Sequence, residues 1–144
     1  MNGLFCVAVH ALIYLDKRGC MLSSEELASN ICTNPARVRK VMAKLKKAGL
    51  VTTRTGTEGG YQITVDPAEL TLDVVADALA VRFVEPAWHS GGGVDCGCMV
   101  ASGMAGVMDH LFDDLDQGCR AKLAQVRLID LERQLKSTQK GESL

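Results

Sequence analysis

Cysteine is the residue type with the most distinctive chemistry in this chain of 144 residues. The cysteines are Cys6, Cys20, Cys32, Cys96, Cys98 and Cys119. We read no secretory signal peptide, so we expect the thiols to stay reduced, and their spacing matches no zinc-finger pattern. Three interpretations stay open. The default is a small buried hydrophobic side chain, which we expect above all for Cys20, Cys32 and Cys119; the others are ligation of a metal or cluster, and a thiol switch at Cys96 and Cys98.

A block of basic residues is the second feature with evident chemistry. Residues 1–60 hold nine Lys/Arg and four Asp/Glu, a net charge of +5, whereas residues 61–144 hold seven and thirteen, a net charge of −6. No acidic residue lies between Glu26 and Glu58. The basic residues in that gap are Arg37, Arg39, Lys40, Lys44, Lys46, Lys47 and Arg54. Such a block indicates a surface that binds a polyanion, although a solvated helix face is the ordinary alternative.

Three helices at the start of the chain are predicted to position the basic block. Apolar residues repeat with helical spacing over residues 3–17. Ser23 and Glu26 have the spacing of a capping box at the start of a short second helix. A third helix is predicted over residues 35–48, because Asn34 is a capping residue and a proline follows it.

The third helix is predicted to have one buried face and one basic face. The apolar side chains are Val38, Val41, Met42 and Leu45. The opposite side carries Arg37, Lys40, Lys44 and Lys47. This division suits a helix that packs on its own domain and enters the major groove of DNA. At its N-terminal end Arg37 can bond guanine and Asn34 can pair with adenine, whereas the later lysines are expected to contact phosphate or nothing.

The remaining segments are predicted to complete a winged helix-turn-helix and to add a long helix. Two β-prone segments, residues 50–54 and 61–65, flank a glycine-rich turn and predict an exposed hairpin. Thr71 is predicted to cap a fourth helix. A long helix with an apolar stripe is predicted to begin near Met99, and a short one to cover residues 128–135.

We therefore predict a mainly α-helical fold with a small β-hairpin, in three parts. Residues 1–84 form a winged helix-turn-helix DNA-binding domain, residues 85–97 a flexible linker and sensor loop, and residues 98–144 a dimerisation helix with a short C-terminal helix. A second subunit is the expected partner of the long helix, because beyond a glycine-rich linker it has little of its own domain to pack against. The predicted DNA contacts are Ser23, Asn34, Ala36, Arg37, Arg39, Lys40, Lys44, Arg54, Thr55, Thr57 and Gly59.

Three short motifs carry a family resemblance. The third helix ends in Ala-Gly-Leu-Val at residues 48–51, Gly-Thr-Glu-Gly-Gly-Tyr stands at residues 56–61, and Leu-Thr-Leu-Asp-Val-Val at residues 70–75. In combination they resemble bacterial winged-helix transcriptional regulators of the IscR/NsrR/CymR family, most of all short members without the full three-cysteine cluster motif. The resemblance covers most of residues 4–135. It implies a homodimeric transcription factor, usually a repressor, whose long helix crosses to its partner and whose wing enters the minor groove.

The same resemblance bears on what the protein senses. Members of this family often hold a [2Fe–2S] cluster through three cysteines before the long helix; here that loop offers Cys96 and Cys98, and Cys98 aligns with the last family cysteine. Some members add an acid and a histidine, four residues apart, from the first helix of the other subunit. Cys6 and His10 occupy those places. The resemblance implies a mixed cluster or metal site across the dimer, with structural cysteines and a satisfied core or interface histidine as the alternative.

The leading interpretation is a homodimeric, sequence-specific DNA-binding regulator of transcription, expected to be a cytoplasmic repressor. It would act on a palindromic operator and respond to redox or iron–sulfur status. The alternatives are a winged-helix module for protein contacts and a small-molecule-responsive regulator without a metal. An enzyme is not expected, because no βαβ pattern surrounds Cys96-Gly97-Cys98 and no phosphate-binding loop is visible. No run of 18 apolar residues occurs, so we expect no membrane span.

Overall fold

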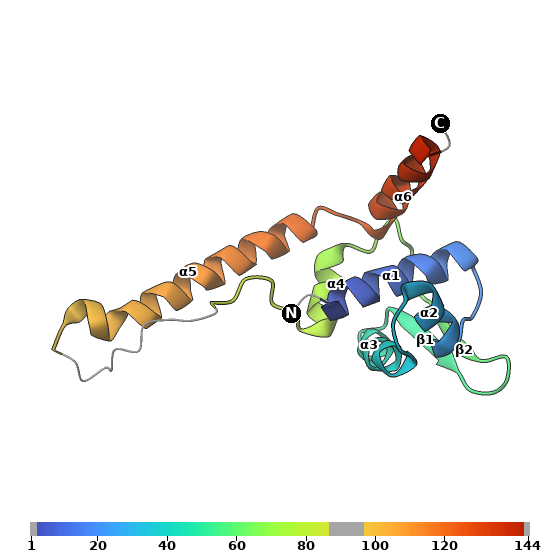
Figure 1. Ribbon diagram of the computed structural model, residues 1–144, viewed down its shortest axis with the longest axis horizontal. Coiled ribbons are helices and arrows are strands. Elements are labelled where there is room, and N and C mark those ends of the chain that lie inside the picture. Colours follow the sequence, from blue (N-terminus) through green and yellow to red (C-terminus); the bar gives the residue numbers. More distant parts are fainter. Residues whose placement is uncertain (1–2, 87–96, 143–144) are drawn as a thin grey trace.

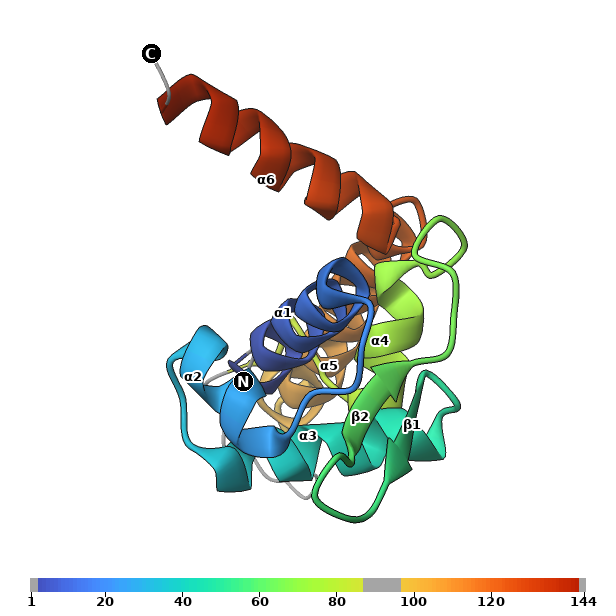
Figure 2. The same cartoon turned by 90° about the vertical axis from the view of Figure 1, so that its right-hand side faces the viewer.

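The computed structural model describes residues 3–86 and 97–142, which form helices and one antiparallel hairpin (Figures 1 and 2). The elements are α1 (Gly3–Arg18), α2 (Ser24–Ile31), α3 (Pro35–Lys47), β1 (Val51–Arg54), β2 (Gly60–Ile63), α4 (Leu72–Leu79), α5 (Met99–Leu123) and α6 (Leu128–Glu142). The predicted class, mainly helical with a small hairpin, is confirmed. Within the described ranges, no helix combines the length and the apolar character that crossing a membrane requires.

Side-chain caps start α2 and α3 at the predicted residues. The hydroxyl of Ser23 accepts a hydrogen bond from the backbone N–H of Glu26 at 3.1 Å, and the Ser23 N–H donates to the Glu26 carboxylate at 2.8 Å. Asn34 Oδ1 accepts from the backbone N–H of Arg37 at 2.8 Å. Each cap contributes about 1 kcal/mol to the stability of its helix. The caps therefore fix the turn between α2 and α3.

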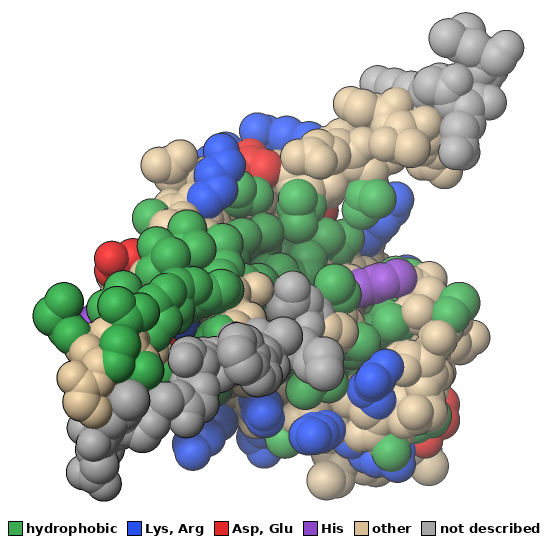
Figure 3. Space-filling model, turned by 60° about the vertical axis from the view of Figure 1, so that its left-hand side comes forward, with side chains coloured by type: hydrophobic (Ala, Val, Ile, Leu, Met, Phe, Trp, Pro, Cys, Tyr) green, Lys and Arg blue, Asp and Glu red, His purple; other side chains and the backbone are tan. Residues whose placement is uncertain are grey.

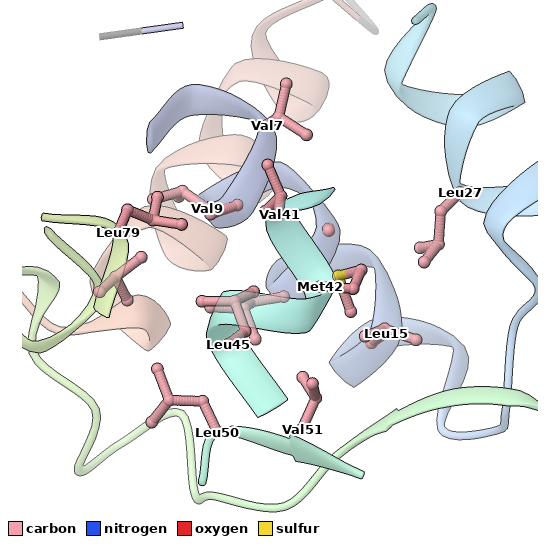
Figure 4. Close-up of a cluster of buried hydrophobic side chains, with 14 of the residues drawn as sticks. Val7, Val9, Leu15, Leu27, Val41, Met42, Leu45, Leu50, Val51 and Leu79 are labelled. Atoms are coloured by element: carbon pink, nitrogen blue, oxygen red, sulfur yellow. The ribbon is translucent and has the colours of Figure 1, made fainter. Parts of the chain in front are cut away.

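The core lies between α1, α2, α3, α4 and the hairpin, which together we call the N-terminal body. Met42 and Leu45 of α3 and Val75 of α4 are completely buried. In Figure 4, Met42 points toward Leu15 of α1, and Leu45 lies near Leu50. Burying a side chain of this size contributes about 1.5–3 kcal/mol. Because one face of α3 is packed in this way, its opposite face must point outward.

The hairpin is anchored on the segment that precedes α2. Its register places Arg54 opposite Gly60. Leu22 pairs with Tyr61 through two backbone hydrogen bonds of 3.0 and 2.8 Å. Gly60 has φ +144°, and a Cβ there would lie 2.4 Å from the carbonyl oxygen of Leu22. Only glycine fits this position without moving the backbone, so the Gly-Gly pair has a structural role in the wing.

The first half of α5 extends away from the N-terminal body (Figure 1). Its exposed large hydrophobic side chains are Met99, Val100, Met104, Val107, Leu111 and Leu115. Figure 3 shows hydrophobic side chains gathered along this helix. Among the described residues of α5, Asp116 alone is buried. The helix thus exposes the residues that a soluble protein normally covers.

The C-terminal helix is longer than predicted. The sequence predicted a helix over residues 128–135, whereas α6 continues to Glu142. The added part is polar and lacks apolar periodicity, which is why pattern analysis ended the helix early. Thr138 bonds back to the carbonyl oxygen of Gln134 at 3.0 Å, within the helix.

Candidate nucleic-acid interface

The inner and outer faces of α3 divide as the sequence predicts. The buried residues of the helix are Val38, Val41, Met42 and Leu45. The exposed or half-buried basic residues are Arg37, Arg39, Lys40, Lys44, Lys46 and Lys47. The helix carries no acidic residue. Its outer face therefore presents positive charge to solvent, and the packed inner face fixes the direction in which that charge points.

The wing and α3 lie on the same side of the N-terminal body. Figures 1 and 2 both show α3 and the hairpin loop at the lower edge of the N-terminal body, and in Figure 2 the loop lies next to α3. Arg54, Thr55 and Thr57 are exposed at this loop. A Cβ on Gly59 would lie 2.1 Å from the carbonyl oxygen of Arg54, so a tight turn holds these three residues outward. The structure thus places the predicted helix and wing contacts on one surface.

Two of the predicted DNA contacts also cap helices. Ser23 uses its hydroxyl in the capping box of α2, and Asn34 uses Oδ1 in the cap of α3. The Asn34 cap accepts one hydrogen bond and leaves the NH₂ group of the amide outside that contact. Ala36 is exposed on the first turn of α3. Asn34 and Ala36 thus lie at the N-terminal end of α3 beside Arg37, whereas Ser23 lies at the start of α2, next to the segment that pairs with the wing.

Arg39 differs from the other basic residues of α3 because it turns back to α2. Its guanidinium donates to the Ser24 hydroxyl at 3.3 Å and lies 3.8 Å from the Glu25 carboxylate. The pKa of Glu25 is lowered, chiefly by the backbone N–H of Glu25 and the Ser24 hydroxyl, and in smaller part by Arg39. The Arg39 side chain is still 54% exposed, which leaves it able to reach a phosphate. Arg37 and Lys40 are exposed, and no ion pair is found for either within the described residues.

No cysteine that the structure describes is buried, which corrects the default expectation of buried structural thiols. Within the described residues, Cys6, Cys20, Cys32 and Cys98 are exposed and Cys119 is half-buried. The reason is local. Cys32 ends α2 with φ 64°, a left-handed turn at the surface, and Cys20 follows the glycine that ends α1. The prediction for Cys96 lies outside the described residues.

The predicted cluster ligands do not meet within one chain. Cys6 and His10 are exposed on α1, and His10 Nε2 lies 2.8 Å from Asn30 Oδ1. Cys98 precedes α5 at the far end of the molecule (Figure 1). No group of three or more His, Cys, Asp or Glu suited to a metal occurs in the described part of the chain. Thiolate and imidazole are suitable ligands for iron, but the geometry of a single chain does not assemble them.

Cys98 has a distinctive environment of its own. The pKa of its thiol is lowered, first by the backbone N–H of Ala101 and then by that of Val100, while desolvation acts in the opposite direction. Both amides belong to the first turn of α5, whose unpaired N–H groups favour an anion. Thiolate is the reactive form of cysteine, so these amides favour the reactive form of Cys98.

An apolar groove between α1 and α6 is a feature that the sequence did not predict. The groove encloses about 750 Å³. Its lining includes Phe5, Val9 and Ile13 of α1 and Leu131 and Leu135 of α6, with Cys6 and His10 among the other residues. The i, i+4 pair of leucines in α6 was the available signal, but the sequence does not show which helix faces it.

Comparisons with known proteins agree with the fold and identify the family. Residues 2–134 match the family described as Rrf2, iron-dependent transcriptional regulator. YwnA of Bacillus subtilis (strain 168), described as an HTH-type transcriptional regulator, is 30% identical over 137 residues, which cover 94% of this chain and 98% of YwnA. A solved transcriptional regulator from Lactobacillus plantarum has a TM-score of 0.84 and 28% identity, with 100% of each chain covered.

A more distant solved structure shares the fold. IscR of T. potens has a TM-score of 0.68 at 17% identity, and the match covers 96% of this chain and 90% of IscR. The motif resemblance, the described architecture and these comparisons agree, and the family comprises regulators rather than enzymes. The chain belongs to the Rrf2 family of transcriptional regulators, whose winged-helix DNA-binding fold it has.

Proposed function

We propose that this chain is a homodimeric, sequence-specific DNA-binding repressor that occupies a palindromic operator. The observation that carries the proposal is the outer face of α3, which is basic, exposed and free of acidic residues beside an exposed wing. A surface of this kind attracts the phosphate backbone and releases counterions from it. The inner face of α3 is completely packed, so DNA can approach the basic face while the body stays folded.

The residues of this surface divide into base contacts and phosphate contacts. Arg37 and Asn34 stand at the N-terminal end of α3, where a recognition helix reaches base edges in the major groove. Lys40, Lys44 and Lys47 continue along the helix and suit phosphate contacts, which position the protein without reading sequence. The wing would reach the adjacent minor groove with Arg54 and the two threonines of the loop.

The exposed stripe of α5 supports a dimer. Val107 is 63% exposed and Leu111 is 47% exposed on a helix that leaves its own N-terminal body. The groove between α1 and α6 offers a second apolar surface that the described residues leave open. A twofold dimer in which α5 of each chain packs on its partner would cover both surfaces and present two α3 helices to successive major grooves. Such a dimer on a promoter would exclude other proteins from the same DNA.

A sensing role for the cysteines is the finer part of the proposal. Crossing of α5 to the partner would bring Cys96 and Cys98 of one chain toward Cys6 and His10 of the other, and those side chains would hold a [2Fe–2S] cluster. Without a cluster, the activated thiol of Cys98 would be the reactive group. Iron and acid-labile sulfide analysis after anaerobic purification separates the two forms, because an iron-free, colourless regulator excludes the cluster.

Selection from a random DNA pool, followed by binding measurements on the recovered operator, tests the proposed function. The variant Arg37→Ala/Lys40→Ala removes two positive charges from α3, and the control Lys122→Ala/Arg133→Ala removes two from α5 and α6. We expect the first to lose operator binding with the dimer intact, because base and phosphate contacts each contribute about 1–3 kcal/mol. The control should bind normally.

Two results would contradict the proposed function. If the α3 variant binds the operator with unchanged affinity and sequence preference, α3 is not the recognition helix. If wild-type protein enriches no sequence and its affinity for duplex DNA does not fall with salt, the fold serves protein contacts instead.

A further inference from the structure

A polar junction joins α5 to α4 and the segment after it. Asp116 is the only buried charged side chain among the described residues, at 7% exposure. Its Oδ1 accepts hydrogen bonds from the backbone N–H groups of Phe83 at 2.7 Å and Val84 at 3.1 Å, and its Oδ2 lies 3.3 Å from Arg120 Nε. Arg120 also donates to the Asp77 carboxylate of α4 and to the carbonyl oxygen of residue 81. One guanidinium thus connects three segments.

A second attachment holds the segment that follows α5 at the opposite end of α4. The backbone N–H of Leu72 donates to the carbonyl oxygen of Val126 at 2.9 Å, and that of Leu128 donates to Leu70 at 2.8 Å. Asp116 and Val126 are ten residues apart in the sequence, and the part of α5 between them, from Asp116 to Leu123, is about 10 Å long. One attachment would let α5 swivel, whereas two fix its direction relative to the N-terminal body.

A small change in the direction of α5 at the junction becomes a larger displacement at the far end of the helix. Residues 99–115 extend beyond the junction, which is about 25 Å of helix. A swing of about 10° at the junction would move the far end of α5 by about 4 Å, close to the rise of one base pair. Since α4 packs against α3 in the core, the same junction fixes the angle between α5 and the basic helix.

We propose that Arg120, together with Asp77 and Asp116, is a positioning residue that sets the half-site spacing recognised by the dimer. This inference rests on the proposed homodimeric DNA-binding function. When α5 is the element shared between two subunits, its angle to each N-terminal body determines the separation of the two α3 helices. The separation of recognition helices in turn selects the distance between half-sites.

The charge state of Asp116 dictates which variants are informative. Burial opposes its ionisation, but the two backbone N–H groups and Arg120 outweigh burial and lower its pKa, so it is charged at neutral pH. Removing Arg120 completely would leave a buried charge without its partner, a strongly destabilising change. Asp77 has a 67% exposed side chain. Asp77→Ala therefore cuts the link to α4 and preserves the Arg120–Asp116 pair.

The experiment measures affinity for the selected operator and for versions with one or two base pairs added or removed between the half-sites. The variants are Asp77→Ala and Arg120→Lys, with Lys122→Ala as the control on the same helix. We expect the two junction variants to reduce the ratio of affinities between the best and the shifted spacings by about fivefold, the coupling typical of one salt-bridge network. The control should keep the wild-type ratio.

The ratio distinguishes positioning from damage to the fold. Loss of folded protein lowers affinity for every spacing equally and leaves the ratio unchanged. An unchanged ratio in folded, dimeric Asp77→Ala protein would overturn the inference, as would wild-type protein that binds all spacings equally while still reading each half-site. Wild-type protein that binds no selected duplex would instead overturn the proposed function.

Discussion

Apolar side chains are buried in the N-terminal body and exposed along the first half of α5. In the body, Leu12, Met42 and Leu45 have no exposed surface. On α5, Met99 is 85% exposed and Val107 is 63% exposed. The body has a packed hydrophobic core and presents a charged face, whereas the described part of α5 presents an apolar stripe to solvent. This difference is the one expected of the proposed regulator, in which the body would meet DNA and α5 would meet a second copy of the chain.

Breaking the core should have the largest effect. Leu45→Ala deletes a completely buried side chain of α3 and should lower the free energy of unfolding by about 2–5 kcal/mol. The neighbouring Lys46→Ala, on the exposed side, should change it by less than about 0.5 kcal/mol. Urea unfolding at one fixed protein concentration measures both. Equal effects of the two variants would mean that α3 does not pack as described.

Breaking the α5 stripe should dissociate the dimer and leave the body folded. Leu111→Asp places a charge in the proposed interface and should weaken association by about 2 kcal/mol or more, a factor of about 30 in Kd. Asp114→Ala, exposed on the same helix, is the matched control. Sedimentation equilibrium gives the Kd, and circular dichroism reports the fold. A Leu111→Asp protein as dimeric as wild type would show that α5 is not the interface.

A strained backbone in the wing should lower the stability of the N-terminal body by an intermediate amount. Gly60→Ala places a Cβ 2.4 Å from the carbonyl oxygen of Leu22 at a positive φ, and should cost about 1–3 kcal/mol. Gly118→Ala in α5 meets no atom within 4 Å and should stabilise by about 0.5–1 kcal/mol, because alanine favours a helix. Thermal unfolding compares the two variants. A neutral Gly60→Ala would show that the wing is not held against Leu22.

The contact between α6 and α1 should have the smallest effect on the free energy of unfolding. We expect it to appear as a dependence of that free energy on pH. Burial, and then the neighbouring carboxyl of Asp16, raise the pKa of Glu132 to about 7, while Lys136 and Lys17 act in the opposite direction. A pKa raised by folding means that the stabilising contribution is fully present below the unfolded value of 4.5 and is lost as pH rises through about 7. Glu132→Gln should flatten this part of the pH profile of unfolding; identical profiles would contradict it.

Helix caps and buried helix faces could be predicted from the sequence because they depend on residues that are close neighbours along the chain. The capping box of Ser23 and Glu26 and the Asn34 cap each depend on residues three positions apart. The buried face of α3 follows from helical periodicity. The family motifs then join these elements into one winged-helix fold.

Features that depend on contacts between residues far apart in the sequence could not be predicted from it. Asp116 looks like one of several acids in α5, yet its partners include the backbone of Phe83 and Val84, more than thirty residues away. The exposure of Cys32 follows from its left-handed turn. The groove between α1 and α6 needs the relative placement of two helices that the sequence separates by most of its length.

The central claim is that the outer face of α3 binds DNA through its positive charges. The most direct measurement is the operator affinity as a function of salt for wild-type protein and Lys47→Ala. We predict a steep negative slope of log affinity against log salt, and a slope reduced by about 1.8 in the variant, because a dimer loses two phosphate contacts. A wild-type slope near zero, or an identical slope after removal of the lysine, would contradict the account.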